Sequence, residues 1–144
     1  GRKKELIVTA AGKNVAPAPL EDHIRSHVLV SQAMVLGDAE PFISALVTID
    51  EEAFADWTED NEHSAASVSE LADSEPLRRE IQEAIDRANA SVSRAESIRE
   101  FVILPADFSL EREEITPTLK VRRAVVVENY RSTIEAIYRG SPRS

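Results

Sequence analysis

Two apolar runs separated by a turn-forming segment constrain the fold of this chain more than any other feature. Residues 32–36 and 42–49 are rich in β-branched and other apolar side chains, and residues 37–41 between them read Gly-Asp-Ala-Glu-Pro. Apolar runs that flank a glycine- and proline-containing turn predict two strands paired as an antiparallel hairpin. A third apolar run, residues 101–104, ends at Pro105 and predicts a further strand. The chain therefore has the strands for a small antiparallel sheet.

Helical periodicity surrounds these strands. Apolar side chains recur every three or four positions in residues 75–92 and in residues 122–139, which predicts two amphipathic helices. A shorter helix is expected over residues 20–27, and residues 5–9 and 15–16 predict an N-terminal β-hairpin that could not be stable alone. Strands and helices mix without regular βαβ alternation. The predicted class is therefore α+β: a small antiparallel sheet with an N-terminal β-hairpin, flanked by helices.

The charge balance excludes several classes of function. The 144 residues fit one domain and carry 26 acidic against 17 basic side chains, a net charge of −9. Such a surface repels a phosphate backbone, so no nucleic-acid partner is expected. The absence of cysteine excludes disulfides, thiol nucleophiles and thiolate metal sites.

The expected location is cytoplasmic. The sequence has no run of roughly 18 apolar residues that could form a transmembrane segment, and it lacks an apolar signal-peptide core. Peripheral membrane association of a full-length parent is compatible with these features. A chain that opens with Gly-Arg-Lys-Lys is expected to be part of something longer.

The lysines are concentrated in two basic segments. Residues 1–14 and residues 115–123 each carry a net charge of +3, on a chain that is otherwise strongly acidic. Residues 106–123 have no periodicity and are expected to form a loop. The two segments hold all four lysines of the chain, Lys3, Lys4, Lys13 and Lys120. Two small basic segments on an acidic body favour a local site for a small anion.

Taken singly, each basic segment has an ordinary structural interpretation. The sequence also lacks the residue patterns of metal, nucleotide-binding and serine-nucleophile sites. Residues 1–17 alone read as a charged tail that leads into an edge strand, and residues 115–123 as a basic loop before a helix. His23 and His27 have the i, i+4 spacing of metal ligands, but the sequence has no HExxH pattern, so no metal site is expected. It also has no phosphate-binding glycine loop and no G-x-S-x-G nucleophile elbow.

Together, the two basic segments carry a family resemblance. Residues 1–17 resemble the segment that joins the two domains of acyl-CoA synthetases in the adenylate-forming superfamily. Residues 115–123 contain Thr-Pro-Thr-Leu-Lys, which resembles the C-terminal lysine motif of that superfamily in the form typical of long-chain fatty-acid–CoA ligases. The acidic helical insertion between them, residues 50–95, is also similar to that subfamily. The resemblance covers the chain from Gly1 to about Tyr138.

The resemblance implies a mobile C-terminal domain, residues 1–144, whose partner is a large N-terminal domain absent from this chain. The family joins ATP and a carboxylate into an acyl-adenylate and pyrophosphate, and the thiol of coenzyme A then displaces AMP. ATP and coenzyme A are thus the implied cosubstrates, with Mg²⁺ accompanying ATP in the full-length enzyme. The isolated domain is expected to be inactive.

The resemblance also implies a role for particular residues. Lys120 matches the catalytic lysine of adenylation, and Lys4 matches the hinge residue about which the domain rotates. Arg2 matches an arginine near the nucleotide. Gly12 matches the hairpin glycine that borders the pantetheine tunnel, and Lys13 is placed to meet a coenzyme A phosphate.

Two alternative functions remain open at this stage. The first is another adenylate-forming ligase that uses an aryl or medium-chain acid, because the C-terminal domain hardly touches the acyl chain. The second is a non-catalytic interaction module whose acidic residues 50–75 dock a basic partner. The first predicts a preference for aryl acids in the full-length parent, and the second predicts that Lys120 is dispensable.

Overall fold

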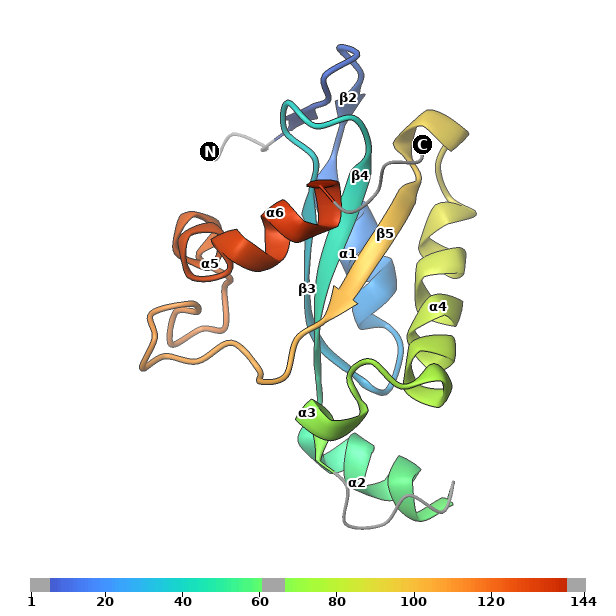
Figure 1. Cartoon of the computed structure of the whole chain (residues 1–144), viewed down its shortest axis with the longest axis vertical. Coiled ribbons are helices and arrows are strands. Elements are labelled where there is room, and N and C mark those ends of the chain that lie inside the picture. The colour runs from blue at the N-terminus through green and yellow to red at the C-terminus, as the bar shows by residue number, and fades with distance from the viewer. Residues whose placement is uncertain (1–5, 61–66, 140–144) are drawn as a thin grey trace.

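A three-stranded sheet forms the centre of the molecule. The structure is a computed structural model, and it describes residues 6–60 and 67–139. Strand β3 (Val30–Leu36) pairs antiparallel with β4 (Ile43–Ile49), with Val35 opposite Ala45. The predicted hairpin is therefore confirmed, and β4 is the central strand of the order β3-β4-β5 (Figure 1).

The third strand runs in the direction opposite to the one expected. Strand β5 (Ile98–Ile103) pairs parallel with β4, with Leu46 opposite Val102, so the sheet is mixed and the prediction of an all-antiparallel sheet is wrong at this strand. The reason is the connection between β4 and β5. It crosses over through helices and returns the chain to the end of the sheet where β4 begins, and such a crossover produces a parallel neighbour.

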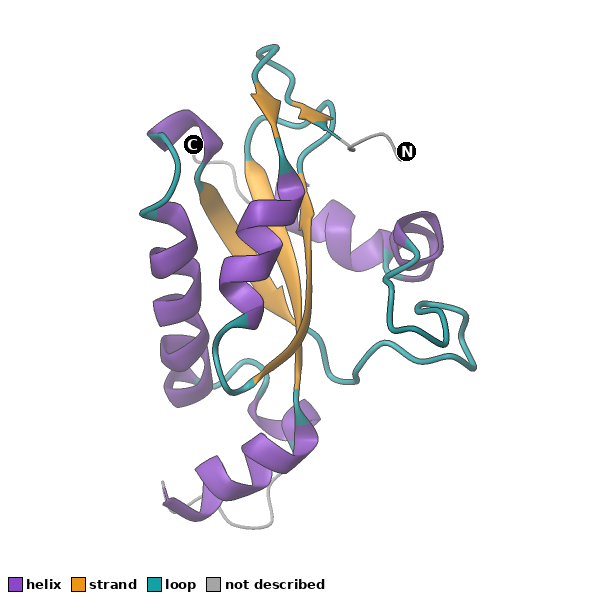
Figure 2. Ribbon diagram, turned by 180° about the vertical axis from the view of Figure 1, so that it is seen from behind, coloured by secondary structure: helices purple, strands orange, loops and turns teal. Residues whose placement is uncertain are grey.

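Helices cover both faces of the sheet, and each face has its own hydrophobic cluster. Helices α1 (Pro17–Arg25) and α4 (Glu75–Asn89) pack with the larger cluster (Figure 2). Helices α5 (Arg123–Asn129) and α6 (Arg131–Arg139) pack with the smaller one. Every residue of β4 is buried, because its side chains alternate between the two faces of the sheet and helices cover both faces. The α+β class is confirmed.

The N-terminal hairpin is held by the turn of the larger hairpin. Strands β1 (Ile7–Val8) and β2 (Asn14–Val15) pair antiparallel, as predicted, although each is only two residues long. The Val8 N–H donates to Asp38 Oδ1 at 3.0 Å, and the Ala39 N–H donates to the Val8 carbonyl at 2.8 Å. These bonds supply the support that such a small hairpin lacks by itself.

Two short helices precede α4 in the acidic segment. Helix α2 (Glu51–Asp60) extends beyond the end of the sheet, followed by α3 (Val68–Leu71) (Figure 1). A single 3-10 turn, η1 (Arg94–Glu96), precedes β5. Over the described ranges, no helix combines the length and hydropathy that a bilayer span requires.

The predicted helix over residues 122–139 is divided into two. Helix α5 ends at Asn129, and α6 starts at Arg131. Tyr130 between them has a φ of −113° and a ψ of 27°, outside the helical region. The bend turns α6 so that Ile134 and Ile137 reach the same cluster as Val126. Two helices can both pack on the sheet face, whereas a single straight helix over residues 122–139 could not follow its curvature.

Candidate functional site

Lys120 lies in a small hairpin within the segment expected to be an irregular loop. Ile115 and Val121 form an antiparallel bridge. The Thr116 N–H donates to the Lys120 carbonyl at 2.9 Å, and the Lys120 N–H donates to Thr116 Oγ1 at 3.0 Å. Leu119 has a φ of 68° at the tip. Residues 114–122, hereafter the lysine hairpin, therefore hold the Lys120 backbone at a defined position.

The side of the lysine hairpin that carries Lys120 faces an open groove of about 920 Å³. The opposite wall is the first turns of α1, and the floor is β3. Gln32 on β3 donates from Nε2 to the Leu119 carbonyl at 3.4 Å, which ties the hairpin tip to the sheet. The charged side chains that line the groove are Glu21, Asp22, Arg25, Lys120 and Arg123. Lys120 is exposed, so its ammonium is free to reach a partner outside the domain.

A partly buried ion pair anchors the exit of the lysine hairpin. Arg123 Nη1 donates to Glu21 Oε2 at 2.8 Å, with side chains 27% and 13% exposed. The same two side chains bind the backbone of Val35: its N–H donates to Glu21 Oε2 at 2.8 Å, and its carbonyl accepts from Arg123 Nη2. Because β3 is an edge strand, these bonds replace those of a missing neighbour strand. The pair joins α1, β3 and the start of α5.

Arg123→Met is expected to lower the free energy of unfolding of the domain by about 1–3 kcal/mol, because the Val35 carbonyl loses the Arg123 donor and the Glu21 carboxylate keeps only the Val35 N–H. Urea denaturation measures this change. Arg25→Met is the control, since Arg25 pairs with Asp22 at the surface and should contribute less than about 1 kcal/mol. Equal losses in the two variants would contradict the assignment of Arg123 as an anchor.

Gly12 occupies the turn of the N-terminal hairpin, as predicted. Its φ is +88°, a conformation that favours glycine, and its N–H donates to the Thr9 carbonyl at 2.8 Å. The Thr9 N–H in turn donates to the carbonyl of Lys13 at 3.0 Å. A Cβ built on Gly12 would have no atom within 4 Å, so the turn is open to solvent on that side. Lys13 is exposed beside it.

The predicted site residues do not converge on one place within the described part of the chain. The turn that holds Gly12 and Lys13 stands at one end of the molecule, while the loop that leads to Lys120 projects from the side (Figure 1). Arg2 and Lys4 lie outside the described residues. Of the described residues, Gly12 and Lys13 therefore lie on a different surface from Lys120.

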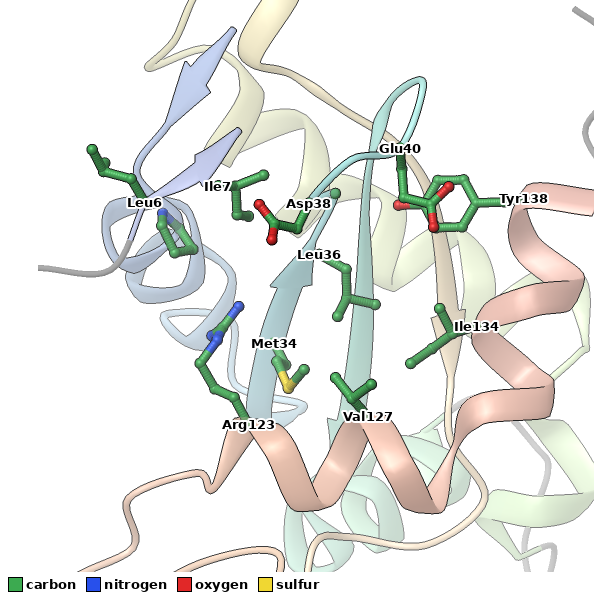
Figure 3. Close-up of a pocket in the computed structure, with 12 residues that line it drawn as sticks. Leu6, Ile7, Met34, Leu36, Asp38, Glu40, Arg123, Val127, Ile134 and Tyr138 are labelled. Atoms are coloured by element: carbon green, nitrogen blue, oxygen red, sulfur yellow. The ribbon is translucent and has the colours of Figure 1, made fainter. Parts of the chain in front are cut away.

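Sequence reasoning missed a largely apolar cavity of about 410 Å³ between the N-terminal hairpin, β3 and helices α5 and α6 (Figure 3). Tyr138 closes one side: its hydroxyl bonds with Ser44 Oγ at 2.7 Å and donates to the Phe42 carbonyl at 3.1 Å. Burial raises the pKa of Tyr138 to about 12, and burial also raises the pKa of Glu40 at the rim. The lining comes from segments far apart in the sequence, so no local pattern could have revealed it.

His27 meets two glutamates of α4, but its hydrogen bonding disfavours a metal. One ligand atom from each of His27, Glu80 and Glu83 lies within 4.8 Å of the others. The His27 Nδ1 accepts a hydrogen bond from the Leu29 N–H at 3.1 Å. A neutral imidazole that ligates a metal through Nε2 carries its proton on Nδ1, where it would face that N–H. His23 does not belong to this group.

A protein-family model described as the AMP-binding enzyme C-terminal domain matches residues 4–142. The chain is 60% identical over 139 residues to the long-chain-fatty-acid–CoA ligase FadD15 of Mycobacterium tuberculosis, which covers 96% of this chain and 23% of that protein. It is 33% identical to the human long-chain-fatty-acid–CoA ligase ACSBG1, over 96% of this chain and 22% of that protein. The chain thus spans about a quarter of the length of these relatives.

Solved structures share the fold. The A-PCP didomain of a carboxylic acid reductase from Segniliparus rugosus superposes with a TM-score of 0.72 at 22% identity, covering 96% of this chain and 18% of that one. A fatty acyl CoA synthetase of Mycobacterium tuberculosis superposes with a TM-score of 0.55 at 22% identity, covering 92% and 21%. With the family match over nearly the whole chain, the conclusion is that this chain belongs to the AMP-binding enzyme C-terminal domain family and is the C-terminal domain of an adenylate-forming enzyme.

Proposed function

We propose that this domain serves a long-chain fatty-acid–CoA ligase, which activates a fatty acid with ATP through an acyl-adenylate and transfers the acyl group to coenzyme A. The observation that carries the proposal is the 60% identity to FadD15 over 96% of the chain, including the segments of Gly12 and Lys120. Its partner is the N-terminal domain of the same enzyme.

In this proposal Lys120 acts in the first half-reaction. A carboxylate oxygen of the fatty acid bonds to the α-phosphorus of ATP while the bond from that phosphorus to the pyrophosphate oxygen breaks. Negative charge builds on the phosphoryl oxygens, and an ammonium stabilises such charge as a mobile point charge. The exposure of Lys120 on a braced hairpin beside an open groove supports this role, because the ammonium must be both positioned and able to extend.

Gly12 and Lys13 act in the second half-reaction. The thiol sulfur of coenzyme A bonds to the acyl carbon, the bond from that carbon to the AMP oxygen breaks, AMP leaves with the bonding electrons, and the thiol proton passes to the solvent. The open space beside Gly12 would let the narrow pantetheine arm approach the backbone, and the Lys13 ammonium would meet a phosphate of coenzyme A. The separation of this turn from Lys120 fits a domain that presents one surface in each step, with Lys4 as the hinge and Arg2 near the nucleotide.

Gly12→Ala in the full-length ligase is expected to slow thioester formation by roughly tenfold and to leave adenylation unchanged. Alanine at this positive φ costs on the order of 1–3 kcal/mol of strain, and its methyl group occupies space assigned to coenzyme A. The measurement is acyl-CoA formation from pre-made palmitoyl-adenylate. Ala11→Ser is the control in the same turn. A loss of adenylation with an intact thioester step would contradict the role of Gly12.

The proposed cosubstrates also suggest how Mg²⁺ would be bound and where in the cell the enzyme acts. Mg²⁺ would be held mainly by the phosphate oxygens of ATP, its usual mode in ATP-dependent enzymes, rather than by this domain. ATP and coenzyme A as cosubstrates support a cytoplasmic location, with any membrane contact made by the full-length enzyme.

The substrate class is tested by assaying the full-length ligase with acids from acetate to palmitate and with benzoate. Highest kcat/KM with palmitate supports the proposal, and preference for benzoate would contradict it. The isolated chain is expected to form no acyl-CoA. The interaction-module alternative predicts instead that deletion of residues 50–75 abolishes binding of a basic partner protein.

A further inference from the structure

The base of the lysine hairpin contains a buried carboxylate that the reaction does not use directly. Among residues 6–60 and 67–139, Glu114 is the acidic residue with no exposed surface. Its neighbour Glu113 is 73% exposed. An ionised carboxylate taken out of water destabilises a fold unless donors replace the lost hydration. Hydrogen-bond donors are therefore expected around the Glu114 carboxylate.

Three donors from two segments converge on the Glu114 carboxylate. The Ser109 N–H donates to Oε1 at 3.1 Å, Arg112 Nε donates to Oε2 at 3.2 Å, and Asn129 Nδ2 donates to Oε2 at 3.0 Å. Arg112 also donates from Nη2 to the Asp107 carbonyl at 2.8 Å. The carboxylate thus joins the loop after β5 to the last residue of α5.

Glu114 shifts the pKa values of the ionisable side chains beside it. The hydrogen bond to Glu114 raises the pKa of Arg112. Burial raises the pKa of Tyr130, and the negative charge of Glu114 acts in the same direction. Both effects fit a carboxylate that interacts closely with its neighbours in a partly buried network.

The backbone of Glu114 forms the first pair of the lysine hairpin. Its N–H donates to the Ser109 carbonyl at 2.9 Å, and its carbonyl accepts from the Arg122 N–H at 2.7 Å. The next pair is Ile115 with Val121, and Lys120 follows directly. A displacement of Glu114 would therefore move both arms of the hairpin relative to the sheet.

We propose that Glu114 is a positioning residue for Lys120: its buried carboxylate fixes the base of the lysine hairpin so that the ammonium reaches the reacting phosphoryl group. This inference rests on the proposed adenylation role of Lys120. The Glu21–Arg123 pair holds the other end of the same hairpin to α1 and β3. The arrangement leaves the Lys120 side chain free while both ends of its backbone segment are anchored.

The test is Glu114→Gln in the full-length ligase. The amide keeps the size of the side chain, but its NH₂ group faces at least one of the N–H donors that bond to the carboxylate. That hydrogen bond is therefore lost. ATP–pyrophosphate exchange with palmitate is expected to fall by on the order of 10²-fold, the loss typical of a misplaced catalytic group. Thioester formation from pre-made palmitoyl-adenylate is expected to be unchanged. The control is Glu111→Gln, which removes an exposed charge from the same acidic run and should leave both rates unchanged.

Further variants separate a positioning role from a structural one. Adding Asn129→Asp to Glu114→Gln supplies an acceptor for the new amide and should restore most of the exchange rate. If the single variant fails to fold, Asn129→Ala removes one donor and should give the same selective loss, smaller in size. Equal losses in both half-reactions, or unchanged exchange, would overturn the inference.

Lys120→Ala serves as the reference for the proposed function. If Lys120→Ala abolishes exchange and Glu114→Gln does not affect it, the positioning role is wrong and the role of Lys120 stands. If Lys120→Ala leaves exchange intact, the adenylation role of Lys120 is itself wrong, and the inference about Glu114 falls with it.

Discussion

Replacing Lys120 with alanine in the full-length ligase is expected to lower ATP–pyrophosphate exchange by about 10²–10³-fold, the loss typical of removing one group that stabilises transition-state charge. The thioester step from pre-made palmitoyl-adenylate is expected to be unchanged, since the thiol attacks the acyl carbon and no bond to phosphorus forms or breaks in that step. The two assays on the same preparation measure this separation directly.

The control for Lys120→Ala is Arg79→Ala. Arg79 is an exposed cation on α4, paired with Glu75 at 3.5 Å, and its loss changes the net charge of the domain by the same amount. Both half-reactions should be unaffected in this variant. If Lys120→Ala leaves both steps at the normal rate, Lys120 is an ordinary surface lysine, and the non-catalytic interaction module becomes the better interpretation.

Leu46→Ala is expected to lower the free energy of unfolding of the domain by about 2–5 kcal/mol. Leu46 is fully buried at the centre of β4, opposite Met34 on one side and Val102 on the other. Its side chain belongs to the cluster that also holds Val126 of α5, so the cavity opens beneath the helices that follow the lysine hairpin. Urea denaturation should show a lower midpoint with an unchanged slope.

Leu110→Ala is the matched control for Leu46→Ala. Leu110 is 54% exposed, so the same chemical change should alter the free energy of unfolding by no more than about 0.5 kcal/mol. Equal destabilisation by the two changes would mean that the smaller cluster does not stabilise the domain. In the full-length ligase, Leu46→Ala is also expected to weaken adenylation, because α5 carries Asn129 and Arg123.

Local patterns predicted most elements of this fold. The Gly37–Pro41 turn and the apolar runs beside it were sufficient for the central hairpin, and the periodicity of residues 75–92 was sufficient for α4. These predictions succeed because hairpin pairing and helix amphipathicity depend on neighbours in the sequence. The family resemblance likewise rests on two contiguous motifs.

The direction of β5 could not be predicted in the same way. An apolar run such as residues 101–104 reads the same for a parallel and an antiparallel strand, and the difference lies in the path of the crossover between β4 and β5. The bend at Tyr130 was missed for a related reason. The apolar stripe continues through it, and only the shape of the sheet face requires two helices.

The sequence by itself determined the α+β class, the two hairpins, the family and the position of Lys120 in its motif, because each depends on residues close together in the chain. The tertiary structure alone decided which charged side chains are buried. Glu-Arg-Glu-Glu at residues 111–114 reads as a solvated run, yet Glu114 is enclosed and Glu113 is exposed. Burial of one carboxylate requires donors from Ser109, Arg112 and Asn129, and Asn129 comes into reach only when α5 packs on the sheet.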